Sequence, residues 1–555
     1  MQFLLPSRYQ RSILLTFFGL LFACGLRLVP DYGLTYDEEI QRVTGEVSLL
    51  YVFQQLPDRW QQTLLPPQTA ALVAAKGAAV QFSTYHDRDY GVAFELPAVA
   101  LEQLLQLHDA RERFLLRHYL NFLVCFAGLL AFYWLAARRY ANWRVGLVAV
   151  MLLILSPRLF ADFFYNSKDA VFAMLFTLAV ATAIAFGQQP GWRTAFWHAL
   201  ACALAIDVRT VGVLVPAATL ALAGLQVLRG TYAPRRAGAF AALYLVLLAS
   251  LTVAFWPYLW ESPISNFIAS LRSVSHYRWT GTLLYQGRLL TARAIPWHYP
   301  LVWMGLTVPL LYLGFWAVGT VGLLHRLARV RGWLAIREAD WQDLLFLSLG
   351  IAPVVAVIIL HSALYNGWRH LYFVYPVLLL LALRGMVSAW RWRAPSRWRA
   401  HWQPALGVAI GSALAVIGVR MSRLHPLENL YFNALAPQPV GTYYETDYWN
   451  MGLVEGLWWI LRHDPRPHIR ISANLLPAVA VSQLLLPAED RQRLELVTDP
   501  VQADYYLDSS SYPHSAPYAQ PSYTRWAGDV LVFRVYQLPK PSSTPDLRAV
   551  NRAGE

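Results

Sequence analysis

Near its N-terminus the chain reads SILLTFFGLLFACGLRLVPDYGLTYDEE, residues 12–39. The apolar part of this stretch, about 12–30, is long enough to cross the hydrocarbon core of a bilayer. Arg8 and Arg11 precede it, as in a signal peptide, but no small-residue cleavage site follows it, so we predict a retained membrane span. The acidic stretch Tyr36-Asp37-Glu38-Glu39 comes shortly after the end of this span. Its carboxylates are therefore expected just outside the membrane.

The composition indicates an integral membrane protein. Of the 555 residues, 57% are hydrophobic and 14% are charged, whereas a soluble protein averages about 25% charged residues. The net charge of +13 is expected to collect in cytoplasmic loops, so it does not imply a nucleic-acid partner. Cys24, Cys125 and Cys202 all fall within apolar segments, which argues against a disulfide framework and a cysteine-based metal site.

Eleven apolar segments predict an α-helical polytopic membrane protein with about 11 transmembrane helices. They lie at about 12–30, 115–136, 144–160, 169–187, 194–208, 210–228, 238–256, 301–324, 343–361, 371–388 and 404–420. With a cytoplasmic N-terminus, arginines concentrate in the loops that alternation places inside, as the positive-inside rule requires. These are Arg138, Arg139, Arg144, Arg193, Arg229, Arg235, Arg236, Arg326, Arg329, Arg331, Arg391, Arg393, Arg397 and Arg399.

Three parts are expected along the chain. Residues 1–420 form the transmembrane domain, with a long first outside loop at about 31–114. Residues 421–540 form a small α/β domain outside the membrane, and residues 541–555 form a disordered tail. Short strands are predicted at 468–473, 494–497, 503–507 and 530–536, and helices at 454–462 and 478–486.

The acidic stretch is the first candidate for chemistry. A positioned carboxylate can act as a general base toward a hydroxyl group, and a carboxylate near the membrane can hold a divalent metal ion. We predict Asp37 as the base, Glu38 as a supporting or metal-binding carboxylate, and Glu39 as merely solvated. The alternative is a solvated acidic cap beyond the span, and metal dependence stays open.

A second candidate segment, Asn166-Ser167-Lys168-Asp169, opens the fourth span on the same side. Lysine occurs only at positions 76, 168 and 540, so its use at Lys168 suggests a point charge that pairs with a phosphate. Asp162 lies shortly before this segment. The alternative is a Lys–Asp pair at the edge of the span, with the lysine stem snorkelling to the interface.

Two further groups follow on the same side. Arg209, in Asp207-Val208-Arg209, is close to the bilayer, where ionisable residues are paired or functional. Arg369 can bind a phosphate through two hydrogen bonds, and His370 can donate a hydrogen bond or a proton to it. The alternatives are an intrasite salt bridge for Arg209 and a lipid headgroup contact for Arg369. No Walker loop, dinucleotide fingerprint or nucleophile elbow occurs.

In their order and sidedness, these motifs resemble those of the GT-C superfamily of membrane glycosyltransferases, in the branch of bacterial protein O-mannosyltransferases and lipid A aminoarabinose transferases. The resemblance rests on Asp37-Glu38 in the first outside loop, Asp162 with Lys168-Asp169 in the next, Arg369-His370, and the outside α/β domain. Tyr444-Glu445-Thr446-Asp447-Tyr448-Trp449, which opens that domain, looks like a stretch of bacterial members.

The resemblance implies transfer of a sugar, with inversion, from a polyprenyl-phosphate carrier to a lipid, glycan or protein acceptor. The implied location is the outer face of a bacterial inner membrane. Asp37 matches the presumed base, and Lys168, Arg369 and His370 match as phosphate-binding candidates, with Asp162, Asp169 and Arg209 beside them. The chain lacks the sequon-binding signature of oligosaccharyltransferases and the extra soluble repeats of eukaryotic O-mannosyltransferases, which disfavours those particular roles.

Two alternatives belong to other functional classes. A transporter or flippase of lipid-linked saccharides predicts ionisable groups near mid-membrane and internal repeats, whereas the candidate residues cluster on one side and we find no repeat. A non-catalytic membrane scaffold that displays the C-terminal domain leaves the clustering of Asp37, Lys168 and Arg369 unexplained.

Overall fold

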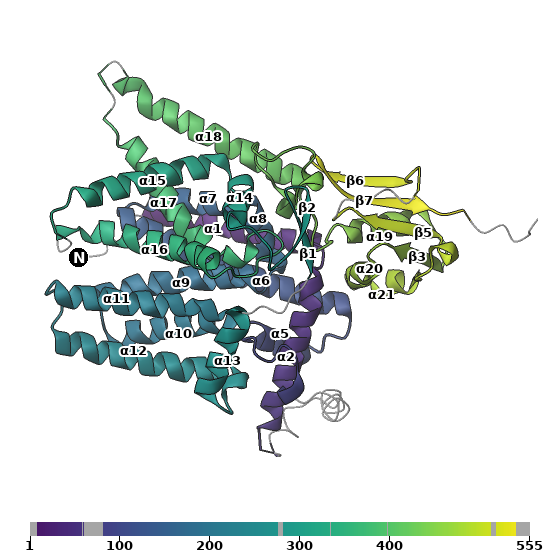
Figure 1. The fold of residues 1–555 in the computed structure, drawn as a ribbon, viewed down its shortest axis with the longest axis horizontal. Helices are drawn as coiled ribbons and strands as arrows, with labels where there is room; N and C mark the ends of the chain where they lie inside the picture. The colour runs from purple at the N-terminus through teal and green to yellow at the C-terminus, as the bar shows by residue number, and fades with distance from the viewer. Residues whose placement is uncertain are drawn as a thin grey trace, which may run out of the picture.

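The computed structural model describes residues 8–57, 59, 82–275, 281–332, 335–393, 395–396, 398–511 and 518–539. A bundle of long helices carries a small α/β domain at one end, which we call the domain end (Figure 1). The predicted tail, 541–555, lies outside the described residues.

Helices occupy all eleven predicted span positions. They are α1 (Arg8–Leu28), α6 (Ala110–Tyr140), α7 (Trp143–Ile154), α9 (Asp169–Gln188), α10 (Trp192–Val208), α11 (Leu214–Leu228), α12 (Pro234–Phe255), α15 (Leu310–Ala328), α16 (Glu338–Ile359), α17 (Val374–Trp390) and α18 (Arg399–Leu424). Among the described residues, eight helices are long and apolar enough to cross a membrane, and nine if one bent pair counts as a span. The predicted multi-pass helical protein is confirmed.

Two predicted spans are not continuous, which corrects the expectation for 144–160 and 301–324. The first is divided into α7 and α8 (Pro157–Tyr165), which meet at 78°. The second is divided into α14 (Tyr299–Thr307) and α15 at Val308 and Pro309. Proline has no amide hydrogen and disfavours helical backbone in the residue before it, so Pro157 and Pro309 account for both breaks.

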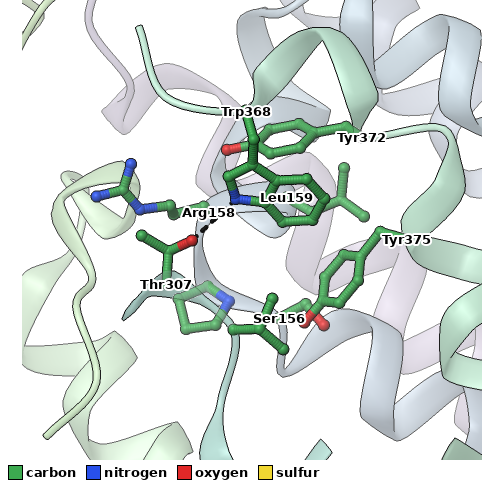
Figure 2. Close-up of a pocket in the computed structure, with 9 residues that line it drawn as sticks. Ser156, Arg158, Leu159, Thr307, Trp368, Tyr372 and Tyr375 are labelled. Atoms are coloured by element: carbon green, nitrogen blue, oxygen red, sulfur yellow. Dashed lines mark hydrogen bonds between the residues drawn. The ribbon is translucent and has the colours of Figure 1, made fainter. Parts of the chain in front are cut away.

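The two breaks face each other across one small cavity. Ser156 and Pro157 line it from the first break, and Thr307 and Val308 line it from the second (Figure 2). The indole nitrogen of Trp368 closes one side by donating a hydrogen bond to Thr307 Oγ1 at 2.9 Å. The broken helices therefore bring the segment around residue 368 to the domain end of the bundle.

The arginine-rich loops after α6, α9, α11, α15 and α17 lie at the end of the bundle opposite the α/β domain (Figure 1). A buried ion network joins three helices there. Asp343 of α16 contacts Arg139 of α6, with Arg139 Nη2 2.5 Å from Asp343 Oδ2, and it also contacts Arg384 of α17. Arg384 in turn lies 3.5 Å from Asp340, one turn earlier in α16. One buried carboxylate therefore neutralises arginines from two neighbouring helices.

Within the predicted outside loop, about 31–114, the described residues include two helices that lie across the domain end (Figure 1). They are α2 (Tyr36–Gln54) and α5 (Glu95–Leu104). Arg42 of α2 contacts Glu102 of α5 at 2.8 Å, and Glu95 of α5 contacts Arg117 of α6. Glu95 also accepts a hydrogen bond from Ser167 Oγ at 2.6 Å. Buried polar contacts thus hold α2 against the bundle.

The segment 257–300 forms α13 (Pro263–Ser275) and a hairpin of β1 (Thr282–Tyr285) and β2 (Arg288–Thr291). Gln286 and Gly287 at its tip both have positive φ, as a two-residue hairpin turn requires. The amide of Gly287 donates to Tyr443 O at 3.0 Å, and Tyr285 forms a β-bridge with Tyr444. The hairpin therefore pairs with the segment that leads into the α/β domain.

The α/β domain contains one mixed sheet in the order β4-β3-β5-β7-β6. Its elements are α19 (Leu453–His463), β3 (Ile469–Ala473), α20 (Leu476–Gln483), α21 (Ala488–Gln492), β4 (Leu494–Leu496), β5 (Tyr505–Ser509), β6 (Tyr523–Ala527) and β7 (Val530–Gln537). The predicted strands and helices are confirmed, while α21 and the edge strand β6 were not predicted. Arg491 Nη2 lies 2.6 Å from Asp109 Oδ2, which ties the domain to the segment before α6.

We expect Asp343→Asn to destabilise the protein strongly. The change leaves two arginines facing a neutral side chain, and removing one partner of a buried ion pair costs about 3–5 kcal/mol. The free energy of unfolding of the purified protein in detergent measures this loss. Arg144→Ala is the control, because Arg144 is exposed near the same end of the bundle. Equal stability of the two variants would contradict the role of the network.

Candidate active site

Arg369 is the centre of a charged cluster at the domain end. It lies in the short helix η6 (Arg369–Leu371), and its side chain is only 4% exposed. Its Nη1 atom is 3.2 Å from Asp37 Oδ2 and 2.9 Å from Asp169 Oδ2. A buried guanidinium is tolerated only with such partners, because removing a charge from water is costly. Carboxylates from α2 and α9 therefore meet on one arginine.

Asp169 joins a second arginine to this cluster. It is the first residue of α9, its side chain is fully buried, and its other oxygen contacts Arg209. Arg209 therefore forms a salt bridge within the cluster, which is the alternative that the sequence left open for it. The neighbouring Asp207 instead accepts a hydrogen bond from the amide of Ala93 at 3.1 Å, next to the start of α5.

Asn166 links Asp162 to Asp169 through hydrogen bonds of its side chain. Its Nδ2 donates to Asp162 Oδ2 at 2.8 Å and lies 3.4 Å from Asp169 Oδ2. Its Oδ1 accepts from the backbone amide of Asp169 at 2.7 Å, which fixes the turn before α9. Tyr165 OH donates to the other oxygen of Asp162 at 2.9 Å. Asp162 is therefore buried behind Asp169, and both of its oxygens accept hydrogen bonds from the protein.

Asp37 and Glu38 point to different surroundings. Both lie in the first turn of α2, whose N-cap is Thr35. Glu38 completes a capping box, because its Oε1 accepts hydrogen bonds from the amide of Thr35 at 2.8 Å and from its hydroxyl at 3.0 Å. Its Oε2 lies 2.9 Å from His118 Nε2. Asp37, by contrast, is 33% exposed beside Arg369, and Glu39 is exposed.

Lys168 and His370 complete the set of predicted site residues. Lys168 Nζ lies 3.7 Å from the centroid of the Tyr90 ring. The ring of His370 packs edge-on against Tyr365, with 4.6 Å between centroids. Burial, and then the adjacent Arg369 guanidinium, hold the pKa of His370 well below its usual value. His370 is therefore neutral near pH 7, so it can donate a hydrogen bond but carries no positive charge.

The described parts of the chain contain no group of three His, Cys, Asp or Glu side chains that converges as metal ligands do. Within the cluster itself, the carboxylates of Asp37 and Asp169 face arginines.

Two contributors were not predicted. Asn166 stands within the segment that the sequence singled out, and its position before a helix could have marked it as a cap. Trp449 comes from the segment that opens the α/β domain, and its ring lies 5.1 Å from the Arg369 guanidinium carbon. Nothing in the local pattern around Trp449 indicates this contact, because it arises only when the domain docks on the bundle.

The sequence matches no described protein family and no curated protein. Among solved structures, the fold is similar to that of ArnT from Cupriavidus metallidurans in the apo state. The two chains are 15% identical with a TM-score of 0.47, over 87% of this chain and 76% of that one. ArnT bound to undecaprenyl phosphate matches at 15% identity and a TM-score of 0.45, over 87% and 77%.

A third solved structure is an oligosaccharyltransferase from Archaeoglobus fulgidus in complex with zinc and sulfate. It is 10% identical, with a TM-score of 0.39, over 76% of this chain and 59% of that one. The similarity is one of fold.

We expect Glu38→Ala to lower stability more than Asp37→Ala. The first change removes the capping box and leaves the buried His118 without its carboxylate, at a cost of about 2–3 kcal/mol. The second removes a partly exposed ion pair worth about 1 kcal/mol or less. Unfolding of both variants in the same detergent measures the difference. A reversed order would show that Glu38 is not the structural member of the pair.

Proposed function

We propose that this protein is an inverting membrane glycosyltransferase that moves a sugar from a polyprenyl-phosphate carrier to a lipid, glycan or protein acceptor. The observation that supports it is the contact between the buried Arg369 and the partly exposed Asp37 at the end of a membrane bundle. We further propose that the domain end faces the outside of a bacterial inner membrane and that the N-terminus is cytoplasmic, as the arginine-rich loops at the opposite end favour.

The cations of the cluster suit a carrier phosphate at the membrane surface. Arg369, Arg209 and Lys168 come from three different segments, and Arg209 is 22% exposed. An arginine can bind two oxygens of one phosphate in a defined geometry. Fixed cations also stabilise the negative charge that grows on a departing phosphate. A neutral His370 adds a hydrogen-bond donor beside them.

In the proposed reaction, the bond between the anomeric carbon and the carrier phosphate breaks, and the electron pair leaves with the phosphate. The acceptor oxygen bonds to the anomeric carbon from the opposite face, which inverts it. Asp37 accepts the proton of the acceptor hydroxyl. Its place in the first turn of α2 holds its carboxylate beside Arg369.

Donor binding and the freedom of the proposed base are linked through Arg369. Without a ligand, the guanidinium contacts the carboxylate of Asp37 at 3.2 Å. A carrier phosphate on Arg369 competes for the same nitrogen and weakens the pair. The carboxylate of Asp37 is then released to accept a hydrogen bond from the acceptor hydroxyl when the donor is bound. We do not propose the transporter alternative, because this cluster lies at one end of the bundle rather than midway along it.

The test measures transfer of radiolabelled sugar. Purified protein in lipid nanodiscs is incubated with undecaprenyl-phosphate sugars and with bacterial membrane lipids, glycans or proteins as acceptors. Asp37→Asn is expected to transfer sugar about 10²–10⁴ times more slowly than the wild type, the usual contribution of a general base. Glu39→Gln is the matched control, because Glu39 is exposed on the same helix turn, and it is expected to retain the wild-type rate.

One outcome would overturn the proposed activity, and two others would overturn the choice of base. If the wild type moves no sugar from any donor to any acceptor, the protein is not such a transferase. If Asp37→Asn keeps the wild-type rate, or if Glu39→Gln loses as much activity, Asp37 is not the base.

A further inference from the structure

The segment between α18 and α19 returns to the charged cluster. Trp449 is 4% exposed, and the guanidinium carbon of Arg369 lies 5.1 Å from its ring centroid and 5.0 Å from that of Tyr365. The ring of Trp449 also packs edge-on against Tyr165, with 5.6 Å between centroids. Tyr165 is the residue that donates to Asp162. Trp449 thus contacts both Arg369 and the tyrosine that holds Asp162.

The α/β domain fixes the turn that carries Trp449. Asp447 accepts hydrogen bonds from the amides of Met451 at 3.2 Å and Gly452 at 2.9 Å. Asn450 adopts a left-handed conformation with φ of 59°, which asparagine tolerates better than most residues.

Contacts with the sheet hold this turn in place. Asn450 Oδ1 accepts hydrogen bonds from Ser509 Oγ and Ser511 Oγ, each at 2.6 Å, at the end of β5. A Cβ atom at Gly452 would lie 2.5 Å from Val532 of β7, so the turn also packs directly on the sheet. The position of Trp449 is therefore set by the sheet.

This arrangement restricts the orientation of the guanidinium. Carboxylates meet its nitrogens, and aromatic rings attract the charged group through their faces. Asp37 and Asp169 supply the first kind of contact, and Trp449 and Tyr365 supply the second. Because Trp449 is itself buried, it acts through Arg369 and not by contact with a sugar.

We propose that Trp449 is a positioning residue that orients Arg369 toward the phosphate of the donor, so that the α/β domain is a component of the donor site. The part of this inference that concerns the phosphate rests on the proposed function. The part that concerns the orientation of Arg369 can be measured without any transfer activity.

The kinetic test compares Trp449→Leu, Trp449→Phe and Trp459→Leu. Trp459 is the matched control, because its ring stacks on His463 and Tyr523 within the same domain. Trp449→Leu is expected to raise the KM for the undecaprenyl-phosphate sugar roughly tenfold, with a smaller change in kcat, since one cation–π contact is lost. Trp449→Phe restores most of the affinity, and Trp459→Leu leaves KM unchanged.

The second test needs no substrate. Phenylglyoxal modifies accessible arginines, and peptide mass spectrometry follows the modification of Arg369. We expect Arg369 to react roughly tenfold faster in Trp449→Leu than in the wild type, and near the wild-type rate in Trp449→Phe and Trp459→Leu. The unfolding midpoint of each variant separates this local effect from general loss of structure.

The outcomes distinguish the two proposals. Unchanged reactivity of Arg369 and unchanged KM in Trp449→Leu would overturn the positioning role, even if sugar transfer is established. Equal effects of leucine and phenylalanine would overturn it as well. If the wild type transfers no sugar but Arg369 becomes reactive only in Trp449→Leu, the proposed function fails while the orientation of Arg369 by Trp449 is supported.

Discussion

A positive charge that is removed from water has to be neutralised where it lies, and this constraint governs the domain end of the molecule. Arg369 is almost fully buried, so it requires carboxylates within contact distance. Asp169 meets it from the start of α9 and Asp37 meets it from α2. The capping box of Glu38, and the contacts of α2 with α5, hold Asp37 at the right place for this pairing.

The two carboxylates around Arg369 are not equivalent. Asp169 is fully buried and contacts both Arg369 and Arg209. It also accepts a hydrogen bond from the side-chain amide of Asn166, so it is fixed in the protein. Asp37 is one-third exposed and has only a 3.2 Å contact with the guanidinium. An incoming anion therefore displaces Asp37 more easily than Asp169. In the proposed mechanism, the carboxylate that is displaced is also the one that accepts the proton.

Hydropathy and the distribution of arginines predicted the span positions, because a bilayer imposes length and polarity on each segment separately. The breaks at Pro157 and Pro309 were missed, although proline was the available signal. Thr35 and Glu38 likewise have the spacing of a capping box, which would have identified Glu38 as structural. The pairing of Arg369 with Asp169 could not be predicted in this way, because it joins residues 200 positions apart. Only the packing of the helices brings them together.

The β1–β2 hairpin has a consequence for the mobility of the α/β domain. Gly287 and Tyr285 pair with the backbone of Tyr443 and Tyr444, just before the α/β domain begins. Arg491 joins the far side of the domain to Asp109. A domain attached on two sides cannot swing open about a single hinge without breaking one of these contacts. In the proposed mechanism, an acceptor would then meet a site whose shape is fixed before it binds.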